Sequence, residues 1–346
     1  MVLENLAMDF LKISCPICGS DEHSLVSNKG QFNIKLYASL CKQCGLMYLN
    51  PRWSKSSYDH FYANLYDHFY RTSKSKKNFP ELYYGKIKQI HGRMLKEGLF
   101  PAKIENALDI GSGEGWPLLY LKENHEKSGK NTPLNLHAIE PSSRCLKTLK
   151  EFGINVISND VDSDWHKKYK HKFDFIIMRH VLEHFMDPVS VLKKVSSSLT
   201  KDGLVYIAVP NSMNPQLPLN KTFFRAVHTF YFSRISLHNV INLSNLEIMH
   251  LSASPKDSPH EIYALCRKSR KAVPPVILND EFFLQKEVLS NSYKKEKSFK
   301  FKIDNSINNL KNHTKRRIIK LIPSGIKKSS YLKKAIGIYH RTKIIN

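Results

Sequence analysis

Hydrophobic and polar positions alternate in blocks through the middle of the chain. Short apolar runs are separated by longer stretches in which apolar residues recur with helical spacing. This alternation predicts a mainly parallel sheet with helices on both faces. The sequence therefore predicts an α/β domain over residues 101–268, with strands at 106–110, 135–139, 154–157, 173–178, 204–209, 246–251 and 260–266.

A glycine-rich turn follows the first expected strand, and a helical pattern begins at Pro117. Residues 107–116 read ALDIGSGEGW, with glycines at 111, 113 and 115. Glycine has no Cβ, so a ligand can approach the backbone and meet the free N–H groups of the helix that follows. The pattern is neither the G-x-G-x-x-G of dinucleotide binders nor a P-loop. It fits a ligand that carries an adenosine but no pyrophosphate.

Polar residues stand at the ends of the expected strands. Ligands of such sheets bind beyond the carboxyl ends of the strands, and a carboxylate after the second strand is placed to bind ribose hydroxyls. We therefore expect this edge to bind a cofactor through Asp109, Gly111, Gly113, Gly115, Glu140, Asp160 and Arg179.

The order of these motifs resembles class I S-adenosylmethionine-dependent methyltransferases of the type 11/12/23-like group, which act mostly on small molecules. The resemblance covers about residues 101–268 and includes RHVLEH at 179–184 and HTFYFSRISL at 228–237. It implies a Rossmann-like sheet of seven strands with the last antiparallel, and S-adenosylmethionine as the cofactor. It also implies that residues after the fourth strand face the acceptor.

Two histidines are candidates for the base that a hydroxyl acceptor would need. His180 follows the fourth strand, and His228 lies in the segment that resembles a substrate-side loop. Either histidine alone is more often structural than catalytic. Residues 180–184 also match the H-x-x-E-H metalloprotease pattern, but that pattern belongs within a helix and here begins at a strand end. We expect Glu183 and His184 to cap the following turn and order the acceptor wall.

Four cysteines near the N-terminus form two C-x-x-C pairs, each followed by glycine. They are Cys15, Cys18, Cys41 and Cys44, with 22 residues between the pairs. Four thiolates make a closed tetrahedral set suited to structural zinc, and the glycines allow tight knuckles. Two redox-active pairs are the alternative, but that reading gives the glycines no role. We expect a zinc ribbon over residues 10–50, with a strand from Phe32 to Leu40.

Residues 51–100 are rich in aromatics and helical in pattern. Tyr58, Tyr62 and Tyr66 are spaced to share one helix face. Such a stripe is usually a packing surface, and the alternative is a lid whose rings stack on a sugar or base. The Asn-Pro-Arg step at 50–52 followed by this helix resembles bacterial proteins of surface-polysaccharide gene clusters.

The positive charge is concentrated at the C-terminal end. Residues 267–346 hold 21 Lys and Arg against 5 Asp and Glu, so they carry +16 of the net +24. We expect residues 269–346 to form a basic, moderately amphipathic helical extension that binds an anionic surface, either lipid headgroups or RNA. The chain shows no transmembrane run, no signal peptide and a reduced-cysteine pattern. These features predict the cytoplasm, with peripheral contact at the inner membrane face.

The predicted function is methyl transfer from S-adenosylmethionine to a small hydroxylated acceptor. The resemblance points to a sugar of a nucleotide- or lipid-linked glycan precursor. An RNA methyltransferase that binds RNA through the ribbon and the tail is the alternative, although the RHVLEH segment is not the Asn/Asp-Pro-Pro-Tyr type of amino-group methylators. A non-catalytic module that kept the fold is a third reading, and the intact glycine turn and Glu140 argue against it.

Overall fold

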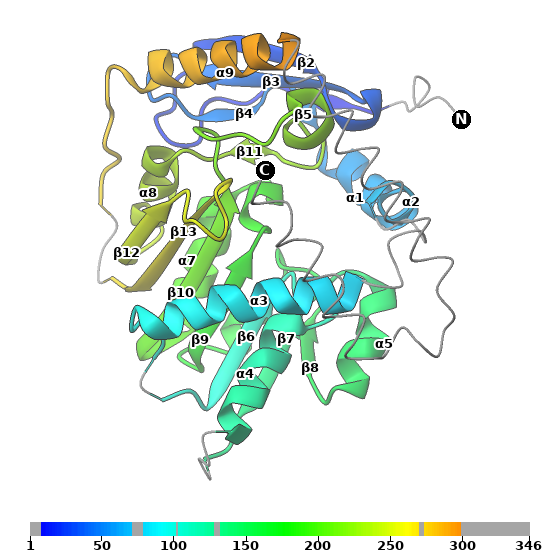
Figure 1. Ribbon diagram of the computed structural model, residues 1–346, viewed down its shortest axis with the longest axis vertical. Helices are drawn as coiled ribbons and strands as arrows, with labels where there is room; N and C mark the ends of the chain where they lie inside the picture. The colour runs from blue at the N-terminus through cyan, green and yellow to red at the C-terminus, as the bar shows by residue number, and fades with distance from the viewer. Residues whose placement is uncertain (1–7, 71–78, 102, 128–131, 270–272, 299–346) are drawn as a thin grey trace, which may run out of the picture. The chain divides into compact units, whose positions relative to one another are not determined.

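The computed structural model describes residues 8–70, 79–101, 103–127, 132–269 and 273–298 (Figure 1). The chain divides into two compact units, residues 1–290 and residues 291–346. Of the predicted basic extension, residues 273–298 are described, whereas residues 299–346 lie outside the described part of the chain. No helix among the described residues is long and apolar enough to cross a membrane.

A seven-stranded sheet forms the centre of the first unit and confirms the predicted α/β fold. Its order is β12-β13-β10-β9-β6-β7-β8, and β13 alone runs antiparallel to its neighbours. All seven strands overlap the predicted runs. The fifth begins five residues earlier than predicted, and every other strand end differs by at most two residues. The strands are β6 (Asn106–Ile110), β7 (Asn135–Ile139), β8 (Asn155–Ser158), β9 (Phe173–Arg179), β10 (Leu199–Pro210), β12 (Leu246–Ala253) and β13 (Glu261–Lys268).

Helices cover both faces of this sheet, as the alternating pattern predicts. Apolar side chains of α3 (Phe79–Lys96), α4 (Trp116–Lys127) and α5 (Ser143–Glu151) pack in one cluster with one face of the strands. Side chains of α6 (Trp165–Lys168), α7 (Pro188–Ser198) and α8 (Arg234–Asn242) pack in a second cluster with the opposite face. Alternate residues of each strand thus enter different cores, which fixes the register of the sheet.

A smaller four-stranded sheet carries the cysteine knuckles. It has the order β11-β4-β3-β2, from β2 (His23–Lys29), β3 (Lys35–Cys41), β4 (Met47–Leu49) and β11 (Phe230–Tyr231). The predicted strand begins three residues later than expected, because a turn at Gln31–Asn33 places Phe32 at φ 62°. Strand β11 comes from the segment between β10 and α8, so the two sheets are joined by the chain itself.

Two further helices, the start of a third and a short strand pair also belong to this unit. Strands β1 (Phe10–Leu11) and β5 (Arg52–Trp53) pair ahead of α1 (Lys55–Asn64) and α2 (Tyr66–Tyr70). Helix α9 (Glu281–Lys297) packs its first turns on the second knuckle: a side chain at Gly45 would clash with Glu281, and Gln285 hydrogen-bonds the Gly45 carbonyl and the Ser212 hydroxyl. The predicted divisions at residues 50, 100 and 268 stay predictions.

Candidate functional site

The glycine turn joins β6 to α4 at the carboxyl edge of the large sheet. The Gly111 N–H donates to the Ile139 carbonyl at 2.8 Å, and the Glu140 N–H donates to the Ser158 carbonyl at 3.2 Å. Strands β6, β7 and β8 are parallel neighbours, so the residues that follow them meet at one edge. The structure therefore brings the turn and Glu140 together, as the sequence predicts.

The three positions of the turn require glycine for different physical reasons. All have positive φ, at 72° for Gly111, 55° for Gly113 and 82° for Gly115. A Cβ at Gly111 would clash with Val181, and one at Gly115 would clash with Ile154 and Leu149. A Cβ at Gly113 would meet nothing within 4 Å. Of these three glycines, only Gly113 leaves open space at the position that a Cβ would occupy.

Glu140 and Ser112 fit a polar ligand at this turn. Glu140 is buried, and its carboxylate accepts from the Gly113 N–H at 2.8 Å and the Ser142 N–H at 2.9 Å. These two donors fix the orientation of the carboxylate beside the turn. The buried Ser112 hydroxyl has no hydrogen-bond partner among the described residues. A buried hydroxyl of this kind is normally satisfied, so a ligand atom would complete it. The residues present thus fit the adenosyl cofactor, and Ser112 is a contact that the sequence pattern did not single out.

Asp160 and Asp109 lie in opposite environments. Asp160 is exposed on the loop after β8, where its carboxylate caps the Asp162 N–H at 2.8 Å. Asp109 is buried at the end of β6. Burial and the neighbouring Glu140 raise the pKa of Asp109 well above its ordinary value, although Arg179 opposes this. A neutral Asp109 can donate a hydrogen bond, whereas Asp160 offers a solvated carboxylate.

Arg179, the last residue of β9, and the half-buried His180 that follows it form an ion-pair network with the buried Glu261 of β13. The distance from Arg179 Nη2 to Glu261 Oε2 is 3.0 Å, and that from His180 Nε2 to the same oxygen is 2.8 Å. His180 Nδ1 lies 3.6 Å from Glu183 Oε1. Burial and Arg179 lower the pKa of His180, but the two carboxylates outweigh them and raise it overall. These contacts favour a charged, ion-paired ring, and the predicted role as a base stays a prediction.

His184, His228 and Tyr62 form a second polar group beside this network. The rings of His184 and His228 lie 4.8 Å apart, and the Tyr62 hydroxyl is 3.0 Å from His184 Nδ1. The side chains of Glu183, His184 and His228 offer ligand atoms within 4.8 Å of one another. Thr229 holds the two segments together, because its hydroxyl hydrogen-bonds the carbonyls of Glu183 and Phe185. Burial lowers the pKa of both histidines, so neutral rings line this wall.

The sequence did not predict that Tyr62 and His184 would meet. Tyr58, one turn earlier, is buried and donates to the Ala226 carbonyl at 3.0 Å, as a packing residue does. Tyr62 is 37% exposed and reaches the acceptor wall. Tyr58 thus packs in the core as predicted, and the predicted lid role of the stripe stays a prediction. Side chains of Tyr83 and Tyr84, part of the same aromatic-rich stretch, lie outside the described residues.

The four predicted metal-ligating cysteines converge. The distance between Sγ atoms is 3.5 Å for Cys15 and Cys44 and also 3.5 Å for Cys18 and Cys41, and all four lie within 4.8 Å of one another. Four sulfurs bound to zinc at ~2.3 Å would lie about 3.8 Å apart. Both knuckles close alike, with the glycine N–H bonded to the first cysteine's carbonyl. The cluster is compatible with structural zinc.

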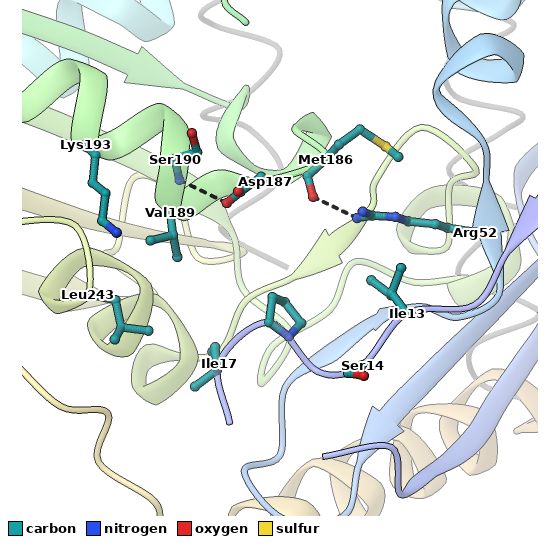
Figure 2. A pocket seen from close by; sticks show the side chains of 11 residues that line it. Ile13, Ser14, Ile17, Arg52, Met186, Asp187, Val189, Ser190, Lys193 and Leu243 are labelled. Atoms are coloured by element: carbon teal, nitrogen blue, oxygen red, sulfur yellow. Dashed lines mark hydrogen bonds between the residues drawn. The ribbon is translucent and has the colours of Figure 1, made fainter. Parts of the chain in front are cut away.

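A separate hollow of about 640 Å³ lies between the first knuckle and α7 (Figure 2). Arg52 donates to the Met186 carbonyl at 2.9 Å there, and Asp187 caps α7 through the Ser190 N–H at 2.9 Å. Ile13, Pro16 and Ile17 form the knuckle side. None of the predicted cofactor or acceptor residues lines this hollow, so it belongs to the seam between the two sheets.

Comparison with known proteins identifies the same fold. A family model described as a methyltransferase domain matches residues 71–251, just over half of the chain. The tRNA U34 carboxymethyltransferase of Aliarcobacter butzleri is 30% identical over 111 residues, 31% of this chain and 34% of that protein. The ubiquinone biosynthesis O-methyltransferase of Actinobacillus pleuropneumoniae is 29% identical over 119 residues, 33% of this chain and 48% of that protein. The chain thus spans a third to a half of the length of these curated relatives.

The 1,6-didemethyltoxoflavin-N1-methyltransferase of Burkholderia thailandensis, solved with 1,6-didemethyltoxoflavin and S-adenosylhomocysteine, superimposes with a TM-score of 0.45 at 16% identity. The match covers 65% of this chain and 95% of that chain.

Proposed function

Because the chain belongs to the class I S-adenosylmethionine-dependent methyltransferases, we propose that it transfers a methyl group from S-adenosylmethionine to a hydroxyl of a small acceptor. The observation that carries this proposal is the pairing of Glu140 with the Gly113 N–H beside open space. The cofactor, when bound, supplies a methyl group on a good leaving group. The protein's contribution is then mainly to hold and orient the two reactants.

The chain's own residues divide this task by position. Glu140 would hold the ribose, and the backbone of Gly111, Gly113 and Gly115 would hold the rest of the cofactor against the turn. Asp109 and Asp160 would offer further polar contacts. Arg179 would support this edge indirectly rather than contact the cofactor, since its side chain is buried against Glu261. Zinc in the cysteine cluster would be structural, because four thiolates leave no open position.

The acceptor would lie against the wall formed by Tyr62, His184 and His228. His228 keeps a neutral ring, which can take a proton from an acceptor hydroxyl. His180 would position this wall through Glu183, since both of its ring nitrogens face carboxylates. We propose a sugar as the acceptor, in a nucleotide- or lipid-linked glycan precursor, because exposed tyrosine rings offer it both stacking surface and hydroxyl partners.

A methyl-transfer assay with radiolabelled S-adenosylmethionine tests this proposal. We expect label in a sugar-nucleotide or polyprenyl-linked saccharide fraction and a loss of at least 100-fold in turnover for His228→Ala, within the range for a general base. His238→Ala, a half-buried histidine on α8, is the control and should retain activity. Label that enters no small-molecule fraction would contradict the proposal.

RNA methylation is the second candidate function. It is favoured by the similarity to the tRNA U34 carboxymethyltransferase and by the net charge of +16 on residues 267–346. Transfer of label to tRNA or ribosomal RNA in the same assay would make it the leading one. Phosphate contacts by the basic tail would then weaken steeply with salt.

We propose a cytoplasmic protein whose tail touches the anionic inner membrane face. In residues 309–338, basic positions would meet headgroups at ~1 kcal/mol per charge, and the isoleucines would enter the interface. Replacing Ile318, Ile319, Leu321 and Ile322 with serine is expected to abolish cosedimentation with anionic vesicles and leave cofactor binding intact. A wild-type protein that does not cosediment with such vesicles but binds RNA would contradict the membrane role. These residues lie outside the described part of the chain.

A further inference from the structure

Arg225 is held rigidly at the edge of the acceptor wall. The backbone N–H of Arg225 donates to the Tyr231 hydroxyl at 3.1 Å, and the same hydroxyl donates to the Arg225 carbonyl at 3.0 Å. Tyr231 is 2% exposed and belongs to the strand β11 that joins the two sheets. The main chain at Arg225 is therefore anchored to the core, and the position of its side chain is correspondingly limited.

The Arg225 guanidinium lacks a carboxylate partner among the described residues. Its Nε donates to the Thr222 carbonyl at 3.2 Å, which orients the plane of the group. Arg93 and Arg179 each pair with an acid, whereas the buried Arg52, like Arg225, donates to a backbone carbonyl. A guanidinium has five N–H donors, and its two terminal nitrogens match the oxygens of a carboxylate or phosphate. Arg225 is thus oriented but not neutralised.

Tyr70 provides a second unsatisfied group beside this arginine. Arg225 Cζ lies 6.0 Å from the centre of the Tyr70 ring. The Tyr70 hydroxyl is buried and has no hydrogen-bond partner in the part of the chain that the structure describes. Buried hydroxyls are normally satisfied, because desolvation without a partner is costly. A ligand oxygen next to Arg225 would satisfy both groups.

A line of aromatic rings connects this pair to the acceptor wall. Tyr70 stacks on Tyr66 at 5.0 Å between ring centres, and Tyr66 packs on Tyr62 at 5.2 Å. Tyr62 then reaches His184 through its hydroxyl. Burial is the main cause that lowers the pKa of His184 and His228, and the charge of Arg225 lowers the pKa of both further.

We propose that Arg225 and Tyr70 form an anion site for a phosphate of the acceptor, so that the substrate is a phosphorylated sugar. The sugar would lie along Tyr62 and Tyr66 with a hydroxyl toward His228, and the phosphate would lie at the guanidinium. This inference rests on the proposed function and narrows its acceptor class. A nucleoside diphosphate sugar and a polyprenyl diphosphate sugar share the required diphosphate.

Calorimetric titration of inorganic pyrophosphate into the full-length protein saturated with S-adenosylhomocysteine tests the site. We expect saturable binding to the wild type and a loss of about 10- to 150-fold in Arg225→Gln, the range for a charged hydrogen bond. Arg225→Lys should retain part of the affinity, since it keeps the charge but loses the planar fork. Arg234→Gln, an exposed arginine at the start of α8, is the matched control and should bind as the wild type does.

Tyr70→Phe removes only the orphan hydroxyl, so it tests the site without unfolding the protein. It should weaken pyrophosphate about 2- to 10-fold. Pyrophosphate that fails to bind while S-adenosylhomocysteine binds would overturn the anion site and leave the methyltransferase proposal standing. Equal affinity in Arg225→Gln and the wild type would also overturn it. If the site holds, UDP-glucose binding tighter than a short polyprenyl diphosphate identifies the nucleotide-linked source, and the reverse order identifies the lipid-linked one.

Discussion

Cys44→Ser is expected to remove zinc from the protein and to unfold the four-stranded sheet. Structural zinc contributes about 10–16 kcal/mol of binding free energy in small zinc modules, which is as large as the whole stability of a typical domain. Cys41 and Cys44 are buried in the same apolar cluster as Phe230 and Leu237 of the methyltransferase segment. Loss of zinc and of the four-stranded sheet should therefore lower the thermal stability of the large sheet as well. Zinc analysis and thermal unfolding measure both effects.

Cys145→Ser is the control for this change. Cys145 is a buried cysteine on α5, on the opposite side of the large sheet from the cluster and outside the four-cysteine set. The Cys145→Ser protein should keep one zinc per chain, and its free energy of unfolding should fall by only about 1 kcal/mol. A wild-type protein purified without zinc, or a Cys44→Ser variant with unchanged zinc content, would contradict a structural site.

Gly111→Ala is expected to destabilise the protein by about 2–5 kcal/mol. About 1–2 kcal/mol comes from forcing a side chain into the left-handed region, and the rest from overpacking against Val181. Gly113→Ala carries the backbone cost alone, because its Cβ would enter open space. Denaturant unfolding of the two variants measures this difference.

Gly113→Ala should have a large effect on cofactor affinity although its effect on stability is the smaller of the two. Its added methyl group would occupy the space where the cofactor approaches the turn, so binding should weaken by roughly tenfold or more despite the small stability loss. A Gly113→Ala protein that binds S-adenosylhomocysteine as tightly as the wild type would show that the open space beside this glycine is not the cofactor site.

The sequence predicted the large sheet well because each strand carries its own signal. Apolar runs bounded by polar residues predicted all seven strands, and the resemblance supplied the reversal of the last one, β13. The carboxyl-edge residues Gly113 and Glu140 follow from strand direction alone. Local pattern and long-range topology agree in this part of the chain.

Three features needed the structure because they depend on contacts between distant segments. Strand β11 has only two residues, and it is a strand because it pairs with Met47 and Tyr48. The buried pairing of Arg179 and His180 with Glu261 joins positions 82 and 81 residues apart, and no local pattern carries it. His180 was accordingly predicted as a base without any sign of its contact with Glu261.

The acceptor wall shows the same limit. Tyr62 and His184 are separated by 122 residues, and neither the aromatic stripe nor the RHVLEH segment predicts their contact. Helical spacing indicated correctly that Tyr58 and Tyr62 lie on related faces. It did not distinguish the buried packing residue from the one that reaches the wall, because that difference depends on what packs against the helix.

Calorimetric titration of S-adenosylhomocysteine tests the central claim most directly. The wild-type protein should bind one molecule per chain, and Glu140→Ala should weaken binding by roughly 1–3 kcal/mol through loss of a buried acceptor. Glu151→Ala, an exposed position at the end of α5, should bind as the wild type does. No saturable binding to the wild type, or wild-type affinity in a folded Glu140→Ala protein, would contradict a cofactor site at this edge of the sheet.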